Sequence, residues 1–118
     1  MGTIRNEMTI IHDRKEDRIE MLRQDAIQTF SKSIEYEDMI SPIMTSYVNE
    51  EYTFVINGDC SKLGWKTSED FHDIRMKWCE KHKYDAESIV VINFGEDGPC
   101  KIIYDNNSDY IGGRENEN

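Results

Sequence analysis

The spacing of apolar side chains along the chain predicts three amphipathic helices. Apolar residues recur at intervals of three and four positions over 17–34, which is the periodicity of a helix with one buried face. A second set predicts a helix over 39–48, with Pro42 in its first turn, where proline is tolerated. A third helix is expected over 67–83, because Thr67 is a good N-cap. The three apolar stripes are Ile19, Leu22, Ala26, Phe30 and Ile34; Met39, Ile43, Tyr47 and Val48; and Phe71, Ile74, Trp78 and His82.

Runs of β-branched and aromatic residues predict strands before and after the third helix. Tyr52–Ile56 is such a run, and it ends at the turn dipeptide Asn57-Gly58. Ser88–Phe94 and Cys100–Tyr104 are two more runs, and the short glycine-containing segment between them predicts a β-hairpin. The patch Thr9–His12 fits either a first strand or the start of a helix, because its periodicity does not distinguish the two.

Together these elements predict a single α+β domain, since 118 residues is the length of one domain. We expect two N-terminal helices packed on a small, mainly antiparallel sheet, with an additional helix inserted before a C-terminal β-hairpin. The domain is expected over 9–104. It follows a flexible N-terminus over 1–8 and precedes a disordered polar tail over 105–118.

Charge and cysteine content narrow the class of protein. The chain has 24 acidic and 14 basic side chains, so its net charge of −10 repels a phosphate backbone, and no nucleic-acid partner is expected. The three cysteines have no paired spacing, which is typical of a reducing compartment and predicts a cytoplasmic protein. No apolar run approaches the roughly 20 residues that span a bilayer, so no membrane partner is expected.

The side chains with catalytic or metal-binding chemistry form no recognisable site. Cys79 and His82 lie one helical turn apart, but zinc ligands usually come in close pairs, and the other two cysteines are isolated. Both residues lie on or beside the apolar stripe of the third helix and are interpreted as core residues. His12 and His72 have no nucleophile with a local motif beside them and are interpreted as surface residues. We therefore predict a protein that is not an enzyme and that has no cofactor and no bound metal.

The remaining candidate is a binding segment over 63–67. Its residues are typical of a loop or of a polar, poorly packed strand at the edge of the sheet. An edge strand offers unpaired backbone N–H and C=O groups to which an extended peptide can add. The expected partner-binding residues are Leu63, Gly64, Trp65, Lys66 and Thr67.

The order of the elements resembles the dynein light chain family, of the small eight-kilodalton type. The resemblance covers about 9–104, and a helix over 68–83 is inserted relative to the family pattern. It implies a homodimer made by swapping an edge strand, and a site for short linear motifs beside that strand. The residues that carry it are Thr9–Ile11, Gln24–Ile27, Asp38-Met39 with Ile43 and Tyr47, Tyr52–Ile56 with Gly58, Leu63-Gly64, and Ile89–Gly95.

The sequence therefore supports two hypotheses about function. The first is an adaptor, similar to a dynein light chain, that binds an extended peptide by strand addition at a sheet edge. The alternative is an acidic inhibitor or immunity-type protein that covers the basic surface of a partner such as a nuclease. Binding of a basic partner through charge is lost at high salt, whereas strand addition is not.

Overall fold

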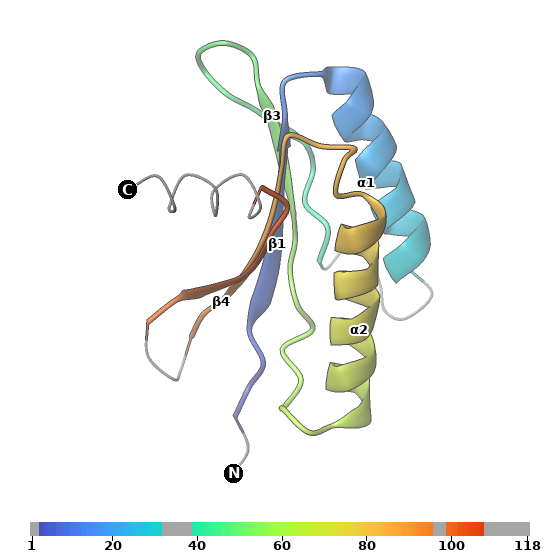
Figure 1. Ribbon diagram of the computed structural model, residues 1–118, viewed down its shortest axis with the longest axis vertical. Helices are drawn as coiled ribbons and strands as arrows, with labels where there is room; N and C mark the ends of the chain where they lie inside the picture. The colour runs from blue at the N-terminus through green and yellow to red at the C-terminus, as the bar shows by residue number, and fades with distance from the viewer. Residues whose placement is uncertain (1–2, 32–38, 96–98, 108–118) are drawn as a thin grey trace.

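A computed structural model describes residues 3–31, 39–95 and 99–107, and these form an antiparallel sheet with helices on one side (Figure 1). The sheet has five strands in the order β2-β3-β1-β4-β5, so β1 is central and β2 and β5 are its edges. The elements are β1 (Glu7–Asp13), α1 (Glu16–Phe30), β2 (Met44–Thr45), β3 (Tyr52–Ile56), α2 (Lys66–Lys81), β4 (Ser88–Asn93) and β5 (Lys101–Asp105).

Both helices cover the same face of the sheet, and the core lies between the two layers (Figure 1). Phe30 of α1 contacts Phe71 of α2, with ring centroids 5.3 Å apart, and also packs near Trp78 at 6.5 Å. These aromatic contacts join the helices to each other as well as to the sheet. The buried apolar residues are Ile11, Ile19, Leu22, Ala26, Phe30, Met39, Ile40, Phe54, Ile56, Phe71, Trp78, Cys79, Ala86, Ile89 and Val91.

The central strand β1 shows how the faces are assigned. Every second residue, from Glu7 to Asp13, is buried against the helices, and the residues between them are half-buried on the opposite face. Ile11 lies opposite Phe54 of β3 and Ile89 of β4, so the core continues across all three strands. The pattern of Thr9–His12 fits either a strand or the start of a helix, and in the structure these residues belong to β1.

Several predictions from periodicity are confirmed. The helix predicted over 17–34 is α1, Glu16–Phe30, and residues 32–34 lie outside the described part of the chain. β3 has the predicted bounds, and β4 pairs with β5 as an antiparallel hairpin. The third predicted helix corresponds to α2. β1 begins before residue 9 and β5 ends after residue 104, so the sheet extends beyond both limits expected for the domain; residues 108–118 lie outside the described part of the chain.

The predicted helix over 39–48 is wrong. This segment is extended and pairs with β3: Ile40 bridges to Ile56, and the Ser41 N–H donates to the Val55 carbonyl at 3.0 Å. A residue that precedes proline disfavours the α conformation, and Ser41 precedes Pro42, so the helix fails at its expected start. The fold class α+β is therefore confirmed, but α1 is the only helix described before β3, and α2 follows it.

Candidate functional site

The segment 63–67 is not a strand. Leu63 and Gly64 form a turn, and Lys66 and Thr67 are the first residues of α2. Gly64 has a φ of +91°, which turns the chain into the helix. The Leu63 N–H donates to the Thr3 carbonyl at 2.8 Å, and the Trp65 N–H donates to the Lys62 carbonyl at 3.1 Å. Two of its backbone donors are therefore already paired, and the segment does not supply the edge expected from the sequence.

What this turn does expose is two large apolar side chains. Leu63 is 47% exposed and Trp65 is 55% exposed, with the Lys62 ammonium 5.6 Å from the centre of the Trp65 ring. Binding of a partner by these residues stays a prediction. It would depend on side-chain contacts and not on backbone pairing.

A larger candidate surface is the face of the sheet that α1 and α2 leave uncovered, here called the open face. No described helix or strand lies on that side of the sheet (Figure 1). In β1, β3, β4 and β5, strand register and the alternation of side chains assign ten residues to it. They are Met8, Ile10, His12, Thr53, Val55, Ser88, Val90, Ile92, Ile102 and Asp105.

The open face is arranged in rows that cross the strands. Val55, Ile10 and Val90 are direct neighbours across β3, β1 and β4. Ile92 lies between Met8 and Ile102 in the next row. These two apolar rows make a continuous hydrophobic surface, and Ile102, at 66% exposed, is its most exposed member. A contiguous apolar surface on a folded chain is typical of a protein interaction site.

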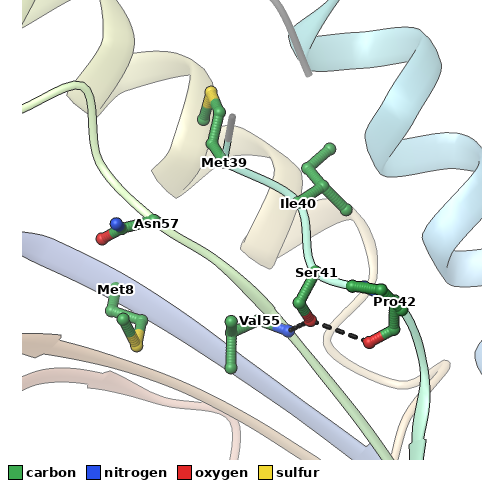
Figure 2. A pocket seen from close by; sticks show the side chains of 7 residues that line it. All are labelled: Met8, Met39, Ile40, Ser41, Pro42, Val55 and Asn57. Atoms are coloured by element: carbon green, nitrogen blue, oxygen red, sulfur yellow. Dashed lines mark hydrogen bonds between the residues drawn. The ribbon is translucent and has the colours of Figure 1, made fainter. Parts of the chain in front are cut away.

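A hollow of about 230 Å³ adjoins the open face at β3. Figure 2 shows Met8 and Val55, from β1 and β3, beside the extended segment that runs from Met39 to Pro42. The Val55 N–H donates to Ser41 Oγ at 2.9 Å, and Ser41 Oγ donates to the Pro42 carbonyl at 2.9 Å. These bonds fix the segment that the sequence predicted as helix, and this segment forms the outer wall of the hollow.

The third row of the open face is polar. His12 lies directly opposite Thr53 on one side and Ser88 on the other. Its Nδ1 is 2.7 Å from Thr53 Oγ1, and its Nε2 is 2.5 Å from Glu51 Oε1. His12 is therefore held in one orientation at the end of the apolar surface. The sequence interpretation as an isolated surface histidine missed these cross-strand partners.

The edge strand β5 exposes apolar side chains next to the open face. Ile102 and Ile103 are exposed there, and with Tyr104 and Asp105 they border a shallow hollow of about 290 Å³. The register shifts between Val91 and Ile92, which leaves Ile103 as an extra residue on β5. Such bulges commonly protect an edge from pairing with another strand.

Buried charged side chains between the helices and the sheet connect these two layers. Arg75 is fully buried: its Nη1 donates to Thr9 Oγ1 at 2.6 Å and to the Ile56 carbonyl at 2.8 Å, and its Nη2 donates to the Asn57 carbonyl at 2.5 Å. Burial lowers the pKa of Arg75 to about 10, against the opposing effect of Glu7, so the guanidinium remains charged at neutral pH. It joins α2 to β1 and to the end of β3.

Glu7 is the carboxylate of this buried group. Its Oε2 lies 3.4 Å from Arg75 Nε without hydrogen-bond geometry, and its Oε1 lies 2.5 Å from Nδ1 of His72. His72 was interpreted as a surface residue, and the structure instead pairs it with a buried acid. Nothing in the local sequence indicates this, because 65 positions separate the two residues.

His82 joins the two helices, and Cys79 is part of the core, as the sequence interpretation expected. His82 lies between two carboxylates, with Nε2 2.6 Å from Asp25 and Nδ1 2.8 Å from Asp85. Burial raises the pKa of the Cys79 thiol to about 12, so it stays protonated and unreactive. No group of three or more candidate ligands able to hold a metal occurs among the described residues.

The chain was compared with protein-family models, with curated proteins and with solved structures. No protein-family model, no curated protein and no solved structure matches the chain. The resemblance to dynein light chains therefore stays a prediction. In the described ranges, neither helix is long and apolar enough to cross a membrane.

Proposed function

We propose that this chain is a protein-interaction module and that the open face is its binding surface. The observation that carries the proposal is β4, whose residues Ile89, Val90, Val91 and Ile92 are apolar on both faces of the sheet. A strand with one face in water normally alternates apolar and polar residues, and continuous apolar runs belong to strands that are covered on both sides. The helices cover only one side of β4, so the other side is interpreted as a surface that a partner covers.

The half-buried residues of the open face fit this role. Ile10, Val55 and Val90 lie in one row without a charged residue between them, and the hollow beside Met8 and Val55 can receive a projecting apolar side chain. Interfaces of this kind depend on a few well-packed apolar anchors in their centre and a polar rim. His12 with Glu51, at one end of the face, would belong to that rim.

Strand addition at β5 is a second candidate for the binding mode. The exposure of Ile102 favours it, and β5 is a longer edge than the two-residue strand β2, whereas the bulge at Ile103 opposes it. An added strand would pair with the β5 backbone, whereas binding on the open face would leave these amides unpaired. Slower hydrogen exchange of β5 amides when the partner is bound would support strand addition.

Photo-crosslinking tests the proposed surface. A benzophenone amino acid placed at Ile102 lies on the open face, and the matched control at Met21, which is 47% exposed, lies on α1. We expect covalent adducts with a discrete protein from the Ile102 position and none from Met21, in lysate from the source cells. Absence of adducts from Ile102, or equal adducts from both positions, would contradict the proposal.

The acidic-inhibitor hypothesis also stays a prediction, and salt separates it from the proposal. Adducts at the open face are expected to persist at high salt because apolar contacts are not screened. A basic partner that is lost at high salt would favour the inhibitor.

A further inference from the structure

We propose that the partner of the open face is a second copy of this chain, so that two sheets pack face to face with the helices outermost. This inference rests on the proposed function and names the occupant of the same surface. Two antiparallel sheets commonly pack with their strands aligned to within about 30° and about 10 Å apart. The resulting dimer has four layers, with helices on both outer sides and the two sheets in the middle.

The distribution of charge favours a second copy as the occupant. The chain carries a net charge of −10, yet the register places only two ionisable residues, His12 and Asp105, on the open face, and the Glu51 carboxylate adjoins it at His12. A partner recruited by charge would bind where the carboxylates are. Two acidic chains, in contrast, meet with the least repulsion through the surface that has fewest charges.

The pattern of rows is compatible with two-fold symmetry. An axis parallel to the strands, passing between β1 and β4, lays β1 of one copy over β4 of the other and leaves the order of the rows unchanged. His12 then faces Ser88 of the second copy, and Ile10 faces Val90 of the second copy. Within β1 and β4, polar residues therefore meet polar residues and apolar residues meet apolar residues, whereas at the outer strands the same axis places Val55 opposite Asp105 of the second copy.

Sedimentation velocity over a concentration series tests this assembly. The wild-type chain is expected to approach twice its mass of 13.9 kDa as concentration rises. Added salt is expected to strengthen the dimer, because it screens the repulsion between the two acidic chains. A monomer at every concentration and salt would overturn the proposal.

Lysine variants locate the interface. Val90→Lys puts a charge in the middle of the apolar surface and is expected to raise the dissociation constant of the dimer by about tenfold or more. Ile102→Lys provides a second variant that is safer for folding, because this side chain is 66% exposed. Met21→Lys, on α1, is the matched control and is expected to leave the dimer unchanged. All variants are first checked for native circular dichroism.

The outcomes separate this inference from the proposed function. A wild-type dimer that survives Ile102→Lys and a folded Val90→Lys uses another surface, which would overturn the inference. A wild-type monomer whose Ile102 photo-crosslinker captures a different protein overturns only the second copy as partner and leaves the interaction surface in place. A dimer lost in both lysine variants, but not in Met21→Lys, supports the inference.

Discussion

The two faces of the sheet are made by the same strands but differ in chemistry. On the covered face, β1 contributes Glu7, Thr9 and Asp13 as well as Ile11, and all four are buried. On the open face, its neighbours include Met8 and Ile10, which are apolar but only half-buried. Strand β1 therefore buries three polar residues beside Ile11 and leaves Met8 and Ile10 on the uncovered face, although polar residues are usually exposed.

This difference shows that burial in the isolated chain is not set by hydrophobicity alone. The covered face tolerates its polar residues because each of them has at least one hydrogen-bond or charged partner. The Asp13 carboxylate, for example, accepts hydrogen bonds from the Lys15 and Glu87 backbone N–H groups at 2.8 and 3.1 Å. The apolar side chains of the open face have no such structural reason within the described fold. Their shared apolar character across three strands is the basis of the proposed binding surface.

The largest expected effect comes from opening a cavity under the helices. Phe30→Ala removes a side chain that is fully buried between Phe71 and Trp78, and it is expected to lower the free energy of unfolding by about 3 to 5 kcal/mol. Urea denaturation measures this change. Met21→Ala, on the exposed side of the same helix, is the control and should stay within about 0.5 kcal/mol of wild type. An unchanged midpoint for Phe30→Ala would show that α1 is not packed on the core.

A matched pair in β1 compares the two faces directly. Ile11 is fully buried on the covered face, and Ile10 is half-buried on the open face of the same strand. At low protein concentration, Ile11→Ala is expected to cost about 2 to 5 kcal/mol, and Ile10→Ala about half of that or less. Urea midpoints measured at several concentrations check this. Equal losses at every concentration would mean that the open face is covered within the isolated chain.

The sequence predicted the covered face better than the open one. Its helical stripe of Ile19, Leu22, Ala26 and Phe30 is buried as expected, because residues three and four positions apart share one face of a helix. The segment 39–48 has the same spacing, but in its stripe Tyr47 is fully exposed and Val48 is 64% exposed. There the conformation before Pro42 and pairing with β3 outweigh the periodicity.

The candidate site was less predictable. The sequence predicts a site at Leu63 to Thr67 because these residues are typical of a polar, poorly packed edge strand, but local sequence does not show which strand will form the edge. The open face depends on the register between β1, β3 and β4, and this comes from long-range pairing. A signal was nevertheless present: Ile89, Val90, Val91 and Ile92 lack the alternation of a strand with one wet face.

A smaller loss of stability is expected when acid protonates Asp25, which contacts His82 between the two helices. Burial raises the pKa of Asp25, but the hydrogen bond and charge of His82, with Lys81, outweigh it and place the pKa below its ordinary value. A depressed carboxylate pKa adds stability above the unfolded value of about 3.9, and this stability is lost as pH falls through the folded value. Asp25→Asn should therefore flatten the acid side of the stability curve. Thermal melting between neutral and acidic pH checks this, and an identical slope in both proteins would contradict it.

The smallest effect is expected from metal removal. Cys79 is buried and His82 is held by two carboxylates, so a chelator is expected to leave the melting temperature unchanged. Differential scanning fluorimetry with and without chelator measures this. Stoichiometric zinc in protein purified without added metal would contradict the prediction.

The buried polar residues of β1 also have a consequence for how the strand finds its place. Ile10 and Ile11 are both apolar, so a shift of β1 by one residue would still bury an isoleucine, and hydrophobicity alone barely distinguishes the two alignments. Thr9 and Glu7 do distinguish the two alignments. In a shifted β1 both residues would face away from Arg75, and the charged guanidinium would remain in the core without these partners. The contacts of Arg75 with Thr9 and Glu7 therefore favour the observed register of β1 over the shifted one. Replacing Arg75 by an apolar residue would remove this preference. Strand β1, which has apolar residues on both faces, could then pair out of register.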